Sequence, residues 1–146
     1  MKVEGARRLA RKLAAMPKAA RAEISAAIEK SADEVVTLQK SFAPKATGRL
    51  ASTIRWRWGG VGIGGELRGD AELSAVITAG GRETQVEIRK GSGVPFDYAV
   101  IQEFGAKGSP PQPYFYPGYR LIKRRVRGRI SRATNKAAKR VAAGGV

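Results

Sequence analysis

The residues of this sequence that could do chemistry are mainly carboxylates and arginines, because the 146-residue chain contains no histidine and no cysteine. Their absence removes the imidazole base, the Ser-His-Asp triad, the thiol nucleophile and the common zinc sites. One acidic cluster is still a candidate: Asp70, Glu72 and Glu87 could meet across a hairpin and hold Mg²⁺, as in a metal-dependent nuclease. However, Arg89 stands where such a site would want a lysine, and Glu87 also fits the solvated side of an alternating strand. We therefore expect a protein that is not an enzyme.

A glycine-rich stretch from Gly60 to Gly65 matches the GxGxxG pattern of dinucleotide-binding loops. That chemistry needs a helix directly after the glycines, so that its first backbone amides meet the pyrophosphate. No helix-forming stretch follows here, because Glu66 to Asp70 continue the loop. We interpret residues 59–70 as a Gly-rich hairpin tip and expect no cofactor.

Positive charge is the dominant chemical feature, with 28 Lys+Arg against 12 Asp+Glu and a formal net charge of +16. Such an excess favours a polyanionic partner, either nucleic acid or an acidic protein surface. The charge is concentrated after Glu103, where eleven basic residues and no acidic residue follow. The residues expected to face DNA or another polyanion are Arg120, Lys123, Arg124, Arg125, Arg127, Arg129 and Arg132. Asn135 is the one asparagine or glutamine of the predicted basic helix that could read bases, so the expected contact is with phosphates and nonspecific in sequence.

Helical periodicity dominates both ends of the chain. Residues 1–43 are predicted to be helical, with a break at Pro17 and apolar residues at helical spacing up to Phe42. Pro44 ends this region, because the residue before a proline is pushed out of the helical conformation. Residues 118–141 are predicted to form a basic helix with one apolar stripe, which consists of Tyr119, Ile122, Val126, Ile130, Ala133, Ala137 and Val141.

The middle of the chain has strand and turn signals. Strands are predicted at residues 53–58, 73–78 and 84–88, so that residues 53–89 form a β-sheet, and Gly80-Gly81 predicts a hairpin between the last two. Residues 96–104 are predicted to be a short helix that Gly105 closes, and residues 107–117, with four prolines, an extended arm. The fold class is therefore α+β: long N-terminal helices and a basic C-terminal helix pack on a small antiparallel β-sheet, as a single domain over residues 1–146.

Aromatic residues provide the candidate subunit contacts, which are Trp56, Trp58, Tyr114, Phe115 and Tyr116. The two tryptophans share one strand face, as core or interface anchors do. An extended aromatic arm is unfavourable in water, so we expect it to dock on its own sheet or on a neighbouring subunit. No apolar run reaches the ~20 residues of a membrane span, and no membrane partner is expected.

Three segments in this order resemble a family of small neck and tail components of long-tailed bacteriophages. They are Ala43–Ile54 (APKATGRLASTI), Tyr98–Ala106 (YAVIQEFGA) and Pro111–Pro117 (PQPYFYP). The family patterns are AP-x-x-TG-x-L-x-x-S-I, YA-x-x-x-EFG and x-x-P-F-x-x-P. The chain departs at Ala106 and Tyr116, where the family often has threonine and arginine.

The resemblance implies a structural virion protein of the head–tail junction, for neck or tail completion or as a tail terminator. It implies a homo-oligomeric ring around the DNA channel, next to connector and tail proteins, and synthesis in the bacterial host cytoplasm before incorporation in the virion. The alternative from the charge is a free, sequence-nonspecific nucleic-acid-binding protein.

Six matched residues receive structural roles: Pro44, Thr47, Gly48, Glu103, Phe104 and Gly105. Thr47 and Gly48 form the turn after the long helix, and Gly48 is free to adopt positive φ. We expect Glu103 to pair with an arginine and Phe104 to pack under the sheet. Gly105 should release the chain into the arm.

Overall fold

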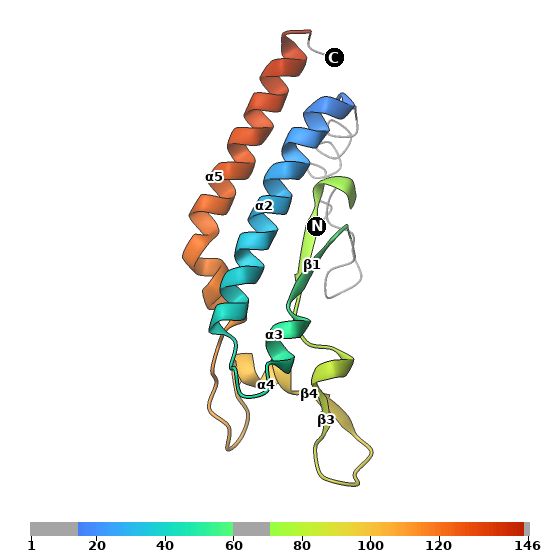
Figure 1. The fold of residues 1–146 in the computed structure, drawn as a ribbon, viewed down its shortest axis with the longest axis vertical. Coiled ribbons are helices and arrows are strands. Elements are labelled where there is room, and N and C mark those ends of the chain that lie inside the picture. Colours follow the sequence, from blue (N-terminus) through green and yellow to red (C-terminus); the bar gives the residue numbers. More distant parts are fainter. Residues whose placement is uncertain (1–14, 60–70, 145–146) are drawn as a thin grey trace, which may run out of the picture. The chain divides into compact units, whose positions relative to one another are not determined.

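The computed structural model describes residues 15–59 and 71–144 (Figure 1). The helix predicted before Pro17 lies almost wholly outside these residues, as does the Gly-rich loop after Gly59. The elements in chain order are α2 (Lys18–Phe42), α3 (Arg49–Thr53), β1 (Arg55–Trp58), η1 (Ala71–Leu73), β2 (Ala75–Thr78), η2 (Arg82–Thr84), β3 (Gln85–Glu87), β4 (Pro95–Asp97), α4 (Tyr98–Phe104) and α5 (Phe115–Ala142). Long helices with small sheets confirm the α+β class. None of the described helices is long and apolar enough to cross a bilayer.

The chain divides into two compact units. Unit 1 comprises residues 1–33, 57–76 and 124–146, and unit 2 comprises residues 34–56 and 77–123. The helices α2 and α5 each contribute residues to both units, and each unit has its own apolar core. The single domain over residues 1–146 stays a prediction.

The core of unit 1 forms between α2 and α5. Ala20, Ile24 and Ile28 of α2 are buried together with Ala137 of α5. Glu23 of α2 forms two ion pairs with α5: its Oε1 lies 3.0 Å from Arg140 Nη2 and 3.2 Å from Lys136 Nζ. The apolar stripe of α5 is therefore confirmed as a packing face in this part of the helix. It contacts α2, and most of the cations lie on the other faces of α5.

The core of unit 2 gathers residues from four parts of the chain. It consists of Val36, Ala43, Leu50, Ile54, Ala99 and Tyr114, with Trp56 and Phe115 packed against it. One polar contact crosses this core: the side chain of Gln39 donates from Nε2 to the carbonyl oxygen of Phe115 at 3.0 Å. The backbone of α5 comes close to α2 here, because a Cβ added to Gly118 would lie 2.9 Å from Cγ of Gln39.

The strands form two separate two-stranded sheets, β1 with β2 and β3 with β4. The predicted hairpin between β2 and β3 is therefore wrong. Gly80 and Gly81 do turn the chain, with φ of 88° and 123°. The turn is held by Asp97, whose carboxylate accepts hydrogen bonds from the amide of Gly81 at 2.8 Å and the hydroxyl of Thr84 at 2.7 Å. Because Asp97 ends β4, this contact brings β3 to β4 in antiparallel register, with Val86 opposite Phe96.

Candidate assembly and polyanion-binding surfaces

The start of α5 is organised by one buried carboxylate. Glu103, which is 7% exposed, accepts hydrogen bonds from the backbone amides of Tyr114 and Phe115 at 2.8 Å and of Tyr116 at 3.0 Å. The first N–H groups of a helix have no partner inside it, and the next residue, Pro117, has no N–H. Every donor at this helix start is thus satisfied or absent, and the negative charge lies at the positive end of the helix dipole.

This arrangement corrects the predicted role of Glu103. Within the described residues it forms no ion pair with an arginine, because its two oxygens are directed at backbone amides instead. It also corrects the start of the final helix, which begins at Phe115 and not at residue 118. Pro117 lies inside the first helical turn, where a proline costs nothing in hydrogen bonding.

The position of Phe104 is a second correction. Its side chain is 65% exposed and does not pack under a sheet. In α4, Ala99 and Glu103 occupy the buried face, and Val100 and Phe104 are on the exposed one. Since Glu103 must point inward to reach the amides of α5, the next residue along the helix is turned outward.

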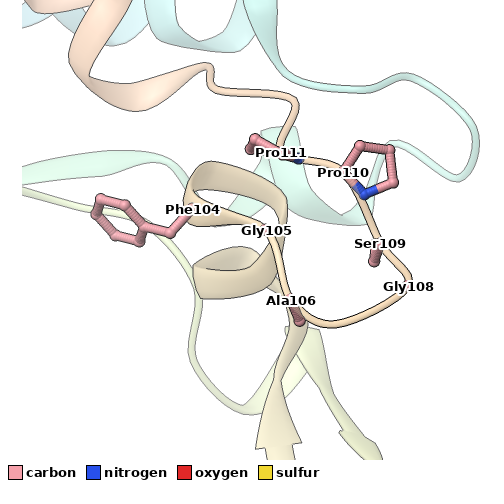
Figure 2. Close-up of a pocket in the computed structure, with 7 residues that line it drawn as sticks. All are labelled: Phe104, Gly105, Ala106, Gly108, Ser109, Pro110 and Pro111. Atoms are coloured by element: carbon pink, nitrogen blue, oxygen red, sulfur yellow. The ribbon is translucent and has the colours of Figure 1, made fainter.

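Gly105 acts as predicted and releases the chain from α4. It has a φ of 77°, and its amide donates to the carbonyl of Ile101 at 2.6 Å. The following residues turn back at an Ala106–Ser109 bridge, and an added Cβ on Gly105 would lie 2.9 Å from Cδ of Pro111. Figure 2 shows the open groove that this turn lines, with Phe104 pointing away from the prolines.

The arm is shorter than predicted and docks on its own unit. The amide of Gln112 donates to the carbonyl of Gln102 at 2.8 Å, and Tyr114 is only 2% exposed. The Tyr114 hydroxyl donates to the carbonyl of Ala99 at 3.4 Å. Burial, helped by the nearby charges of Glu103 and Asp97, raises the pKa of Tyr114 to about 12.

The predicted interface aromatics are spread between core and surface. Tyr114 belongs to the core of unit 2, and Trp56 and Phe115 are half-buried against that core. Trp58 and Tyr116 are more accessible, at 41% and 46% exposed. The Tyr116 ring is 6.1 Å from that of Phe104, and the Arg120 guanidinium is 6.0 Å from the Tyr116 ring centroid. Phe104, which the sequence analysis predicts to be buried, is therefore exposed beside Tyr116.

The turn after α2 follows the prediction. The helix ends at Phe42, two residues before Pro44, and Gly48 adopts the left-handed conformation with a φ of 69°. Thr47 is exposed and precedes this turn. The short helix α3 then places Leu50 and Ile54 in the core of unit 2 before β1 begins.

The predicted polyanion-facing residues are mostly accessible. Arg120, Arg124, Arg125, Arg127 and Arg132 are exposed, and Lys123 and Arg129 are half-buried. Arg129 donates from Nη1 to the hydroxyl of Ser31 at 3.1 Å. Arg120, Arg124 and Arg127 are spaced by four and three residues, which places them on one face of α5. This arginine row has no acidic residue on its own helix.

The carboxylates considered for a metal site have other contacts. Glu72 pairs with Arg21 at 2.6 Å, and Glu87 accepts the amide of Gly91 at 2.8 Å. Asp70 lies outside the described residues. Over residues 15–59 and 71–144, no group of three or more acidic residues is placed to hold a metal ion.

The described residues thus present the exposed rings of Phe104 and Tyr116, a docked arm and a basic helix. A model of the family described as "Bacteriophage HK97-gp10, putative tail-component" matches residues 7–105, and the chain belongs to this family. No curated protein and no solved structure matches it. The protein is a structural component of a bacteriophage tail and, as such, part of the virion. The matched range ends at Gly105, so the arm and α5 follow it.

Proposed function

We propose that this tail component is a ring-forming subunit of the head–tail junction, used for neck or tail completion or as a tail terminator, with DNA passing through the ring. The observation that carries the proposal is the arginine row on α5, in a segment with no acidic residue from Phe104 to the end of the chain. Membership of a tail-component family supplies the context, because DNA is the polyanion that traverses a phage tail.

The arginine row suits contact with a moving duplex. From Arg120 to Arg127 the helix rises by roughly 10 Å, and B-DNA presents one phosphate charge per ~1.7 Å of its axis. Phosphates are therefore within reach in any register, and arginine binds them without reading bases. A nonspecific contact of this kind lets DNA slide. An acidic surface of a neighbouring connector or tail protein is the other polyanion that the row could meet.

Contacts between subunits are proposed at the accessible aromatic residues. Trp58, Tyr116 and the half-buried Trp56 and Phe115 offer the large, partly exposed side chains that anchor interfaces. Tyr114 is itself buried in the core of unit 2, where it fixes the arm next to Phe115 and Tyr116.

Light scattering coupled to size-exclusion chromatography tests the proposal. A ring gives one species whose mass is an integer multiple of 15.6 kDa. A monomer that binds short duplex DNA with a steep salt dependence contradicts it, and favours a free, sequence-nonspecific nucleic-acid-binding protein instead.

A further inference from the structure

The β3–β4 hairpin has an apolar face that nothing in its own unit covers. Val86, Ile88 and Val94 are 40%, 60% and 52% exposed. They lie on one face of the ribbon, because Val86 is opposite Phe96 and the amide of Ile88 donates to the carbonyl of Val94 at 3.2 Å. We call these three residues the ribbon face. Both strands have three residues and no third strand of the described part of the chain joins them, an arrangement that is marginal in water without further packing.

A second uncovered surface lies on the same unit. Val100, Phe104 and Tyr116 form an aromatic patch, with Arg120 at its border above the Tyr116 ring. Val100 and Phe104 are 57% and 65% exposed on a helix that buries a glutamate. A helix that turns its carboxylate inward and its large apolar residues outward is built for a partner on that side.

We infer that the ribbon face of one copy of this chain seats on the aromatic patch of the next copy. The inference rests on the ring proposed above and adds two surfaces to the aromatic contacts proposed there, with Tyr116 common to both. Both surfaces belong to unit 2, so one compact unit carries both halves of the contact.

Charge favours the ribbon face on the patch over the two alternatives, which are patch on patch and ribbon face on ribbon face. Two aromatic patches face to face bring Arg120 of both copies together, and Glu103 of α4 is buried, with its carboxylate bonded to three backbone amides. Two ribbon faces bring together the basic tips that Arg89 and Lys90 form. The ribbon on the patch avoids both encounters between like charges, and the exposed Glu83, which precedes β3 at the end of the hairpin opposite the basic tip, is the acidic residue that can meet Arg120.

The two surfaces differ, so the contact is heterologous. A heterologous contact leaves one free ribbon and one free patch after each addition, and it closes into a ring when the rotation per copy divides a full turn. The contact between two copies involves six side chains and buries a small area. In a closed ring every copy makes this contact twice, so the assembly is more stable than an isolated pair.

Cysteine cross-linking tests the inference directly, because the natural chain has no cysteine. The variants Ile88→Cys and Phe104→Cys are purified separately, mixed, and treated with a short bis-maleimide. The inference predicts a cross-linked dimer in the mixture and little product from either variant alone. Leu121→Cys, at an equally exposed apolar residue outside the patch, is the matched control and gives no dimer with Ile88→Cys.

A second pair of variants tests the contact without cross-linker. Phe104 and Leu121 are 65% and 68% exposed, so serine at either position leaves the core intact. Phe104→Ser should convert rings to monomers, and Leu121→Ser should leave them unchanged. Rings that survive Phe104→Ser, or that give no Ile88–Phe104 cross-link, overturn the inference and leave the proposed function standing. A wild-type chain that is monomeric overturns both.

Discussion

The carboxylate of Glu103 accepts the backbone amide of Tyr114 at 2.8 Å, so a residue near the end of α4 holds the residue just before α5. The same carboxylate also accepts the next two amides. This single side chain therefore fixes where the arm ends, where the basic helix starts and which face of α4 is exposed. The proposed contact surfaces depend on it.

Removal of this carboxylate should destabilise the protein. Glu103→Ala leaves three buried amides without their acceptor, and we expect a loss of about 2–4 kcal/mol in the free energy of unfolding. Glu103→Gln keeps one oxygen and should cost less. Urea denaturation followed by circular dichroism measures both, with the exposed Glu83→Ala as a control within about 0.5 kcal/mol of wild type. A Glu103→Ala variant as stable as that control contradicts the capping role.

Alkaline pH should destabilise the protein through Tyr114. Its pKa is raised from 10.0 to about 12, because burial favours the neutral phenol. As the pH rises, the tyrosine of the unfolded chain ionises before that of the folded protein. The free energy of unfolding therefore keeps its full value with respect to this group below pH 10, and it falls by up to about 3 kcal/mol as the pH rises to 12.

The variant Tyr114→Phe isolates this effect from the titration of lysines. The difference in unfolding free energy between wild type and variant should shrink between pH 9 and 11.5 in urea titrations. Leu121→Ala, at an exposed residue that does not ionise, is the control and should show a difference that does not change with pH. A constant difference for Tyr114→Phe is the result that argues against a buried phenol.

Two glycines of α5 should respond to alanine in opposite directions. A Cβ at Gly118 meets Cγ and the backbone of Gln39 at 2.9–3.2 Å, so Gly118→Ala should destabilise by about 1–3 kcal/mol through overpacking. A Cβ at Gly128 meets only the flexible end of Arg132, so Gly128→Ala should stabilise by up to about 1 kcal/mol. Thermal unfolding of both variants measures the contrast. Equal effects would mean that α5 does not approach α2 at Gly118 as closely as described.

The arginine row should dominate nonspecific DNA binding. Changing Arg120, Arg124 and Arg127 together to glutamine should weaken duplex binding at low salt. It should also lower the slope of log K against log salt by up to about 2.7. The control changes three cations further along α5, Lys136, Lys139 and Arg140, two of which pair with Glu23. Fluorescence anisotropy at several salt concentrations compares the two. Equal losses would show that net charge alone matters.

Local patterns predicted the long elements well and their tertiary contacts poorly. The apolar spacing of α2 and the stripe on α5 were sufficient, because an amphipathic face needs only a core to bury it. The beginning of α5 was missed, since it depends on Glu103, eleven residues before Tyr114. Pro117 was the available signal, because proline is favoured in a first helical turn.

The exposed residues of the candidate surfaces also differ in whether local patterns could predict them. The exposed arginines could be predicted, since a helix with one apolar stripe has its other faces in water. Phe104 could not, because its exposure follows from the inward position of Glu103. The β2–β3 hairpin failed for a related reason: the glycines make the turn, but the side chain of Asp97 determines the partner of β3.

Electron-microscopy class averages of the purified chain would show whether it forms rings. Closed, rotationally symmetric particles with a central opening wide enough for duplex DNA are the expected result. Monomers, or open-ended assemblies with no defined copy number, would contradict ring formation.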